Sequence, residues 1–95
     1  MSASAIPMAR FRIGKIVSTA NALEQLTRED ILRAIGRHQA GDWGDVSEDD
    51  RTKNELALKQ GHRLWSVYHA ANSRKFWLIT EADRRTTTVL LPEDY

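Results

Sequence analysis

The last third of the chain changes its hydrophobic pattern, and this change constrains the fold more than any other feature. β-branched and aromatic residues gather there in three runs, at 64–69, 75–80 and 86–91. Short runs of this composition, separated by turn residues, are typical of β-strands. Asn72-Ser73 predicts a two-residue hairpin loop between the first two runs. We therefore expect the end of the chain to form a three-stranded antiparallel meander.

Helix signals precede this meander. Thr27, with Asp30 three residues later, has the spacing of a shortened capping box, and Gly41 stands where that helix would end. Ser47 is a good N-cap for a second helix, which would run to about residue 60 and end at Gly61. The sequence thus predicts two short helices between the N-terminal segment and the meander, with a single helical turn at 22–26 before them.

The segment 11–17 predicts one more strand, because Phe11, Ile13 and Val17 share a face at a period of two. Such a strand must pair with the meander, since an isolated strand cannot satisfy its backbone. The expected order is β-α-α-β-β-β. We expect a single α+β domain over 10–95, with an antiparallel sheet packed on two short helices, and a flexible leader over 1–9.

Composition and charge limit the classes of function. The chain has 95 residues, 41% of them hydrophobic, a net charge of +1 and no cysteine. A disulfide scaffold and a thiolate zinc site are therefore excluded, and a globally basic nucleic-acid binder is disfavoured. No apolar run is long enough to span a membrane. We expect a cytoplasmic protein without a membrane partner.

Motifs for metal, cofactor or nucleophilic chemistry are not evident. His38, His62 and His69 lack the spacing of metal ligands, and the acid-rich segment 42–50 lacks the ligand pattern of an EF-hand loop. There is no P-loop, dinucleotide fingerprint or G-x-S-x-G. We expect no metal and no cofactor, and a catalytic function is not favoured. A Ser-His pair is not ruled out by sequence, but nothing points to one.

The loop Gly41-Asp42-Trp43-Gly44-Asp45 is the first candidate binding site. A tryptophan between glycines and aspartates either plugs the core from its edge or is an exposed anchor of the kind found in protein interfaces. Both alternatives remain open from sequence. We take Asp42, Trp43 and Asp45 as candidate binding residues.

A second candidate lies at the end of the strand 75–80. Glu81, Asp83 and Arg84 follow that strand, and Arg63 precedes the neighbouring one. Paired carboxylates can divide acid and base roles. The alternative is a turn, in which Asp83 accepts bonds from backbone N–H groups and Glu81 pairs with Arg63 or Arg84.

The two central strands are rich in aromatic residues. If Asn72-Ser73 is the loop, Tyr68 faces Trp77 and His69 faces Phe76 across the hairpin. One face of the sheet would then enter the core. The other would either pack across strands or present an aromatic strip beside basic residues, which suits RNA or a protein partner. Those basic residues are Arg63, Arg74 and Lys75.

The segments 77–84 and 87–95, together with the Gly-Asp loop above, Asn54-Glu55 and Gly61-x-Arg63-Leu64, resemble a family of small bacterial proteins from plasmids and other mobile elements. These are usually labelled hypothetical or plasmid related, and the resemblance covers about 16–95. It gives no established activity. It implies a mobile-element setting, where small proteins often act on host defence, plasmid maintenance or regulation.

A second resemblance is architectural. The β-α-α-β-β-β order is similar to that of RelE/ParE-type toxins, and the ribonucleases of that class place basic and aromatic residues on the C-terminal sheet to hold RNA and stabilise phosphate charge. The near-neutral charge and the acidic ending Pro92-Glu93-Asp94-Tyr95 depart from that pattern. The toxin-like catalytic residues implied by this resemblance would be Arg63, Tyr68, His69, Arg74 and Arg84.

These observations lead to a hypothesis and two alternatives. We expect a non-catalytic binding or accessory protein of a mobile element, such as an anti-defence factor that docks on another protein. The alternatives are a RelE-like endoribonuclease and a small nucleic-acid-binding regulator. The sequence leaves open whether the chain forms a homodimer.

Overall fold

The computed structural model describes residues 8–95. Most of the leader expected over 1–9 lies outside these described residues. The fold is α+β, as predicted. Its elements, in chain order, are β1 (Lys15–Ser18), α1 (Ala20–Gln25), α2 (Arg28–Gln39), α3 (Glu48–Gln60), β2 (Leu64–His69), β3 (Lys75–Thr80), β4 (Thr86–Leu90) and the 3₁₀ turn η1 (Pro92–Asp94).

The four strands form one mixed sheet in the order β1-β4-β3-β2. β2, β3 and β4 make the expected antiparallel meander, whereas β1 runs parallel to β4. The prediction of a wholly antiparallel sheet was therefore wrong in this detail. The chain leaves β1 through three helices and returns at the opposite edge of the sheet, so no hairpin sets the direction of β1.

The first strand is shorter than predicted because of Gly14. Its φ is +68°, and a Cβ there would lie 2.3 Å from the backbone of Arg85. This left-handed residue interrupts the extended run, so Phe11 and Ile13 precede the strand. Phe11 instead lies 6.1 Å from Trp43, ring centre to ring centre, in a stacked pair.

The predicted helix starts and ends are confirmed. Thr27 and Asp30 exchange both bonds of a capping box at the start of α2. Ser47 accepts from the Asp50 N–H at the start of α3, and Gly61 ends that helix in the left-handed conformation. The turn expected at 22–26 is a short helix, α1, capped by Thr19.

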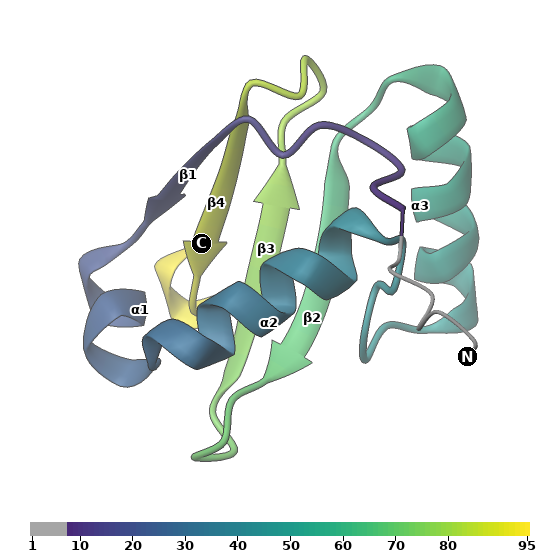
Figure 1. The fold of residues 1–95 in the computed structure, drawn as a ribbon. Coiled ribbons are helices and arrows are strands. Elements are labelled where there is room, and N and C mark those ends of the chain that lie inside the picture. The colour runs from purple at the N-terminus through teal and green to yellow at the C-terminus, as the bar shows by residue number, and fades with distance from the viewer. Residues whose placement is uncertain (1–7) are drawn as a thin grey trace, which may run out of the picture.

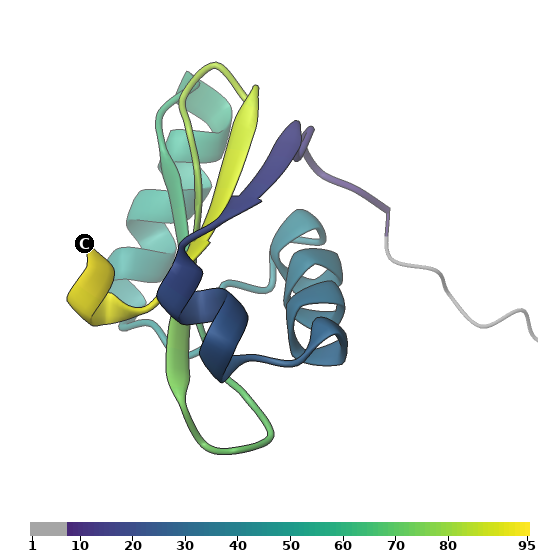
Figure 2. The same cartoon turned by 90° about the vertical axis from the view of Figure 1, so that its left-hand side faces the viewer.

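The helices are distributed unequally around the sheet (Figure 1). α1 and α2 cover one face, which we call the inner face. Figure 2 shows η1 on the opposite side of the sheet, the outer face. α3 runs along β2, where the Asn54 side chain accepts from the Trp65 N–H at 3.1 Å and donates to its carbonyl at 2.6 Å. Most of the outer face is therefore left without a helix.

The core lies between the inner face and α2. Its fully buried side chains include Phe76, Leu78 and Val89, and Ile31 and Ile35 of α2 pack against them. A second cluster joins Trp43, Ala57 and Leu64 beneath α3. No helix among residues 8–95 is both long enough and apolar enough to cross a membrane.

The hairpin between β2 and β3 differs from the prediction by one residue. Tyr68 pairs with Phe76 and His69 with Lys75. The loop has three residues rather than two, because Ser73 adopts a left-handed φ of 70° and the Ala70 N–H bonds the Arg74 carbonyl at 2.9 Å. Because of this shift, Tyr68 shares a face of the sheet with Phe76 rather than with Trp77.

Candidate binding surface

Three aromatic side chains gather on the outer face. Trp65 pairs with Ile79 and Val67 with Trp77, so the two tryptophans point to the same side of the sheet. Their ring centres lie 5.4 Å apart at 86°, and the ring of Tyr95 lies 5.6 Å from that of Trp77 at 64°. Such edge-to-face contacts hold the three rings in a fixed arrangement.

The rings surround a hollow of about 250 Å³ lined by Arg63, Trp65, Trp77, Ile79 and Tyr95, and we call these five residues the aromatic face. Tyr95 is 73% exposed, whereas Ile79 at the floor is 6% exposed. The indole N–H of Trp65 is buried and has no acceptor among the described residues. The surface therefore offers an apolar floor and aromatic walls, while the indole N–H of Trp65 stays buried beneath it.

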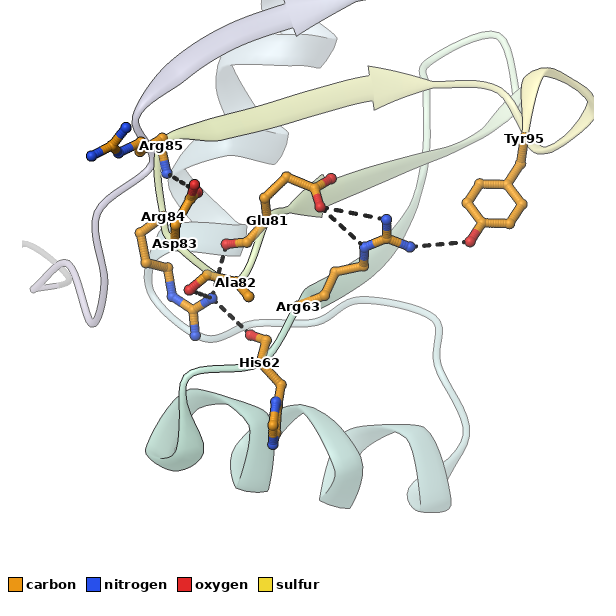
Figure 3. Close-up of polar contacts among 8 residues, drawn as sticks. All are labelled: His62, Arg63, Glu81, Ala82, Asp83, Arg84, Arg85 and Tyr95. Atoms are coloured by element: carbon orange, nitrogen blue, oxygen red, sulfur yellow. Dashed lines mark hydrogen bonds and ion pairs between the residues drawn. The ribbon is translucent and has the colours of Figure 1, made fainter.

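Arg63 lines this hollow, and Figure 3 shows its guanidinium between Glu81 and Tyr95. Its guanidinium donates to the Tyr95 hydroxyl at 3.1 Å and to Oε1 of Glu81 at 3.4 Å. The hydrogen bond to Tyr95 and the charge of Glu81 raise the pKa of Arg63. Of the predicted strand-end residues, the structure thus brings Arg63 and Glu81 together, in the pairing expected for the turn alternative.

Asp83 does not share a site with Glu81. Its Oδ1 accepts from the Arg85 N–H at 2.9 Å, as expected for a turn aspartate. The two carboxylates therefore have separate partners, and the arrangement does not support their use as an acid and base pair.

Arg84 fastens the β3–β4 turn to the end of α3 (Figure 3). Its guanidinium donates to the carbonyls of His62 at 2.7 Å, Glu81 at 3.1 Å and Ala57 at 3.3 Å. One of these carbonyls, that of Ala57, also accepts the backbone N–H groups of Gly61 and His62 at the end of α3. The geometry assigns Arg84 to the architecture of the turn rather than to an exposed binding site.

The Gly-Asp loop is also used internally. Trp43 is fully buried, and its indole N–H donates to Glu55 at 2.9 Å. The core alternative is therefore correct for Trp43, and the exposed-anchor alternative is wrong. Asp42 accepts from Arg37 at 2.7 Å, which lowers the pKa of that carboxyl, and Asp45 lies 4.0 Å from His69.

The residues implied by the toxin resemblance are dispersed. Tyr68 is 3% exposed on the inner face, where its hydroxyl donates to the Asp42 carbonyl at 2.5 Å and burial raises its pKa. His69 is exposed on the outer face, and Arg74 pairs with Glu93 near the hairpin end. Arg84 lies at the other end of β3. The structure does not bring these residues together at one site.

A buried polar chain crosses the core, and sequence reasoning missed it. His38 is fully buried, with Nδ1 2.5 Å from the Ser66 hydroxyl and Nε2 2.8 Å from that of Thr80. The Thr80 hydroxyl lies 2.7 Å from that of Thr87, which donates to the Ile13 carbonyl at 2.6 Å. Burial lowers the pKa of His38 to about 3.

This Ser-His contact is sealed from solvent on every side, because Ser66 is also 0% exposed. The alternation of inward and outward positions along the strands could have revealed this buried polar network, because Ser66 and Thr80 fall at inward positions. Among residues 8–95, no three His, Asp or Glu side chains are grouped so that they could hold a metal ion.

The aromatic face is therefore the surface on which the described residues best support a binding function. Comparison of the chain with protein-family models, curated proteins and solved structures gives no match.

Proposed function

We propose that this chain is a non-catalytic binding protein that docks on another protein through its aromatic face. The observation that carries the proposal is the gathering of Trp65, Trp77 and Tyr95 around a hollow on a sheet face that has no helix over most of its area. Tryptophan, tyrosine and arginine are the residues most enriched among the dominant contacts of protein interfaces.

Charge favours a protein partner over nucleic acid. Two of the three basic residues expected beside the aromatic strip are already paired, Arg63 with Glu81 and Arg74 with Glu93, and Lys75 alone makes no ion pair among residues 8–95. Binding along a phosphate backbone needs several cations free to replace counterions. A neutral rim around aromatic rings suits a polar protein surface better.

The mobile-element resemblance leads us to propose a narrower partner class. A small binding protein in that setting would act on host defence, and a component of a defence system is our proposed partner. In this role the chain would occupy its target rather than modify it.

Affinity capture from the native host tests the proposal. Wild type, Tyr95→Ala and Arg63→Ala would be compared by quantitative mass spectrometry, with Leu23→Ala as a control, because Leu23 is 63% exposed and does not line the hollow. We expect one protein to be captured by wild type and the control, and to be reduced at least about tenfold by both aromatic-face variants. Equal capture by all four proteins would reject the surface.

Overexpression separates this proposal from an RNA-cleaving function. A binding protein without catalysis should not cut cellular RNA when it is produced in excess. Growth arrest with RNA cleavage, relieved by Arg63→Ala, would overturn the non-catalytic proposal even if a partner were captured.

A further inference from the structure

A second surface lies on the other side of the sheet, on the exposed side of α2. A hollow of about 540 Å³ is formed there against the segment that precedes β1, with Ala9, Leu32, Arg33, Gly36, Arg37 and Ala40 among its lining residues. We call it the α2 groove. Leu32 at one end is 55% exposed, although α2 has a well-filled buried side.

Gly36 is the unusual residue of the α2 groove. It lies in the interior of a regular helix, where glycine is less favourable than alanine. A Cβ at Gly36 would meet no atom within 4 Å, so nothing among the described residues requires its absence. Gly14 and Gly44 differ, because a Cβ there would collide with backbone atoms. The open backbone of Gly36 is therefore available to a contact from outside the chain.

The charges of the groove select the partner's chemistry. Arg37 is held by Asp42 at 2.7 Å, and Arg10 by Glu55 at 2.8 Å. Arg33 lines the groove and makes no ion pair within 4.0 Å among residues 8–95, although its charge helps to lower the pKa of Asp30 one turn before it. The guanidinium of Arg33 can bind a carboxylate of a partner, and the exposed Leu32 beside it can contact a row of apolar side chains of the same partner. This arrangement does not fit a phosphate backbone, which requires a track of cations.

The backbone of α2 selects the partner's conformation. Its N–H and C=O groups are bonded within the helix, so α2 has no free edge for strand addition. A segment that packs closely over Gly36 would bury its own backbone and must satisfy it internally. An α-helix does this, and close approach at a glycine lets two helices pack with a short interaxial distance.

From these observations we propose that the α2 groove docks an amphipathic α-helix of a partner protein, with its apolar seam over Leu32 and Gly36 and a carboxylate on Arg33. This inference goes beyond the aromatic face. Figure 2 shows α2 on the opposite side of the sheet from η1, and η1 is followed directly by Tyr95 of the aromatic face. One copy of the chain would then be able to contact two protein surfaces at once.

The probe is a designed helical peptide of about 18 residues with an alanine and leucine seam flanked by glutamates. Its counterpart carries lysine in place of every glutamate. Each is titrated into isotope-labelled protein and followed by NMR. We expect the acidic peptide to shift the amides of Leu32, Arg33 and Gly36, and the lysine peptide to leave them unchanged.

Variants locate the contact. Gly36→Leu and Arg33→Glu should each weaken the acidic peptide at least about tenfold, whereas Thr52→Leu, at an exposed position of α3, should not. Gly36→Ala separates binding from folding. It should raise the unfolding temperature of the free protein by roughly 4–8 °C and still weaken the peptide. Tyr95→Ala should leave peptide binding unchanged, so failure here is distinct from failure of the aromatic face.

Three results would overturn the inference. They are the absence of shifts on α2 at millimolar peptide, equal binding by Gly36→Leu, and shifts confined to the aromatic face. A short DNA duplex is titrated in the same way as the two peptides. If the duplex shifts the α2 amides and the acidic peptide does not, the groove takes nucleic acid and the proposed helix is wrong.

Discussion

Nε2 of His38 lies 2.8 Å from the hydroxyl oxygen of Thr80, and neither side chain reaches solvent. This contact joins α2 to β3 through the middle of the core, and Ser66 and Thr87 extend it to the neighbouring strands. A buried polar group that loses its hydrogen bond costs free energy. The four side chains therefore favour the one position of α2 on the sheet in which all of these bonds are made.

Acid should weaken the fold through His38 before the carboxylates titrate. Its pKa is about 3 in the folded chain and 6.5 as the reference value, so the unfolded chain binds more protons between these pH values. Stability is fully present above pH 6.5 and is lost as pH falls, by up to about 1.4 kcal/mol per pH unit. Urea unfolding from pH 7 to 4.5 measures this slope. His69→Gln, at an exposed histidine, is the control that should keep it. A flat profile over this range would contradict the prediction.

Gly44 and Gly61 have similar backbone angles but differ in the space around them, so substitutions at the two positions separate the cost of a steric clash from the cost of a left-handed backbone. Their φ values are 77° and 75°, but a Cβ at Gly44 would lie 1.9 Å from the Val67 carbonyl oxygen, and one at Gly61 would meet nothing within 4 Å. Gly61→Ala should cost only the left-handed penalty, about 1–2 kcal/mol. Gly44→Ala should cost clearly more, because the loop must also move away from β2. Denaturant midpoints measure both, and equal losses would show that the loop is free to shift.

Glu55 should contribute more to stability than its ion pair alone. Its carboxylate accepts from Arg10 at 2.8 Å and from the buried indole of Trp43 at 2.9 Å, and these bonds lower its pKa to about 2. Arg10→Ala removes a half-exposed ion pair and should cost less than about 1 kcal/mol. Glu55→Ala also leaves the indole N–H unbonded and should cost about 1–3 kcal/mol. Urea unfolding of the two variants gives the comparison, and similar losses would remove the special role of Trp43.

Arg84 should behave as a structural residue. Arg84→Lys keeps the charge but cannot reach the carbonyls of His62, Glu81 and Ala57 together, so we expect a loss of about 1–3 kcal/mol in the free energy of unfolding. Arg85→Lys, at the exposed neighbouring position, should be neutral. Unchanged stability of Arg84→Lys would mean that the turn does not depend on this guanidinium.

Local signals in the sequence predicted the helices well. The bonds at Thr27, Asp30 and Ser47 join residues a few positions apart, so the spacing of residue types is enough to predict them. The same holds for Gly61, whose left-handed conformation ends α3 through a local bond from its own N–H to the Ala57 carbonyl.

Features that depend on distant contacts were not predictable in this way. The hairpin register turned on Ser73, an L-residue that adopts a positive φ, whereas the Asn72-Ser73 pair suggested a tighter loop. Trp43 could be placed only once α3 and Phe11 were known to cover it. The parallel pairing of β1 with β4 likewise depends on where the helices return the chain.

The two edges of the sheet are closed to different degrees. Along β2, the Asn54 side chain bonds both backbone groups of Trp65, and Gly44 forms a parallel bridge with Val67. β1 ends the sheet on the other side with only four residues, one of them the exposed Lys15. Strand-to-strand growth into a larger assembly is therefore blocked at β2. At β1, pairing with another strand is limited to a few backbone bonds next to a positive charge, a feature that protects sheet edges against edge-to-edge aggregation.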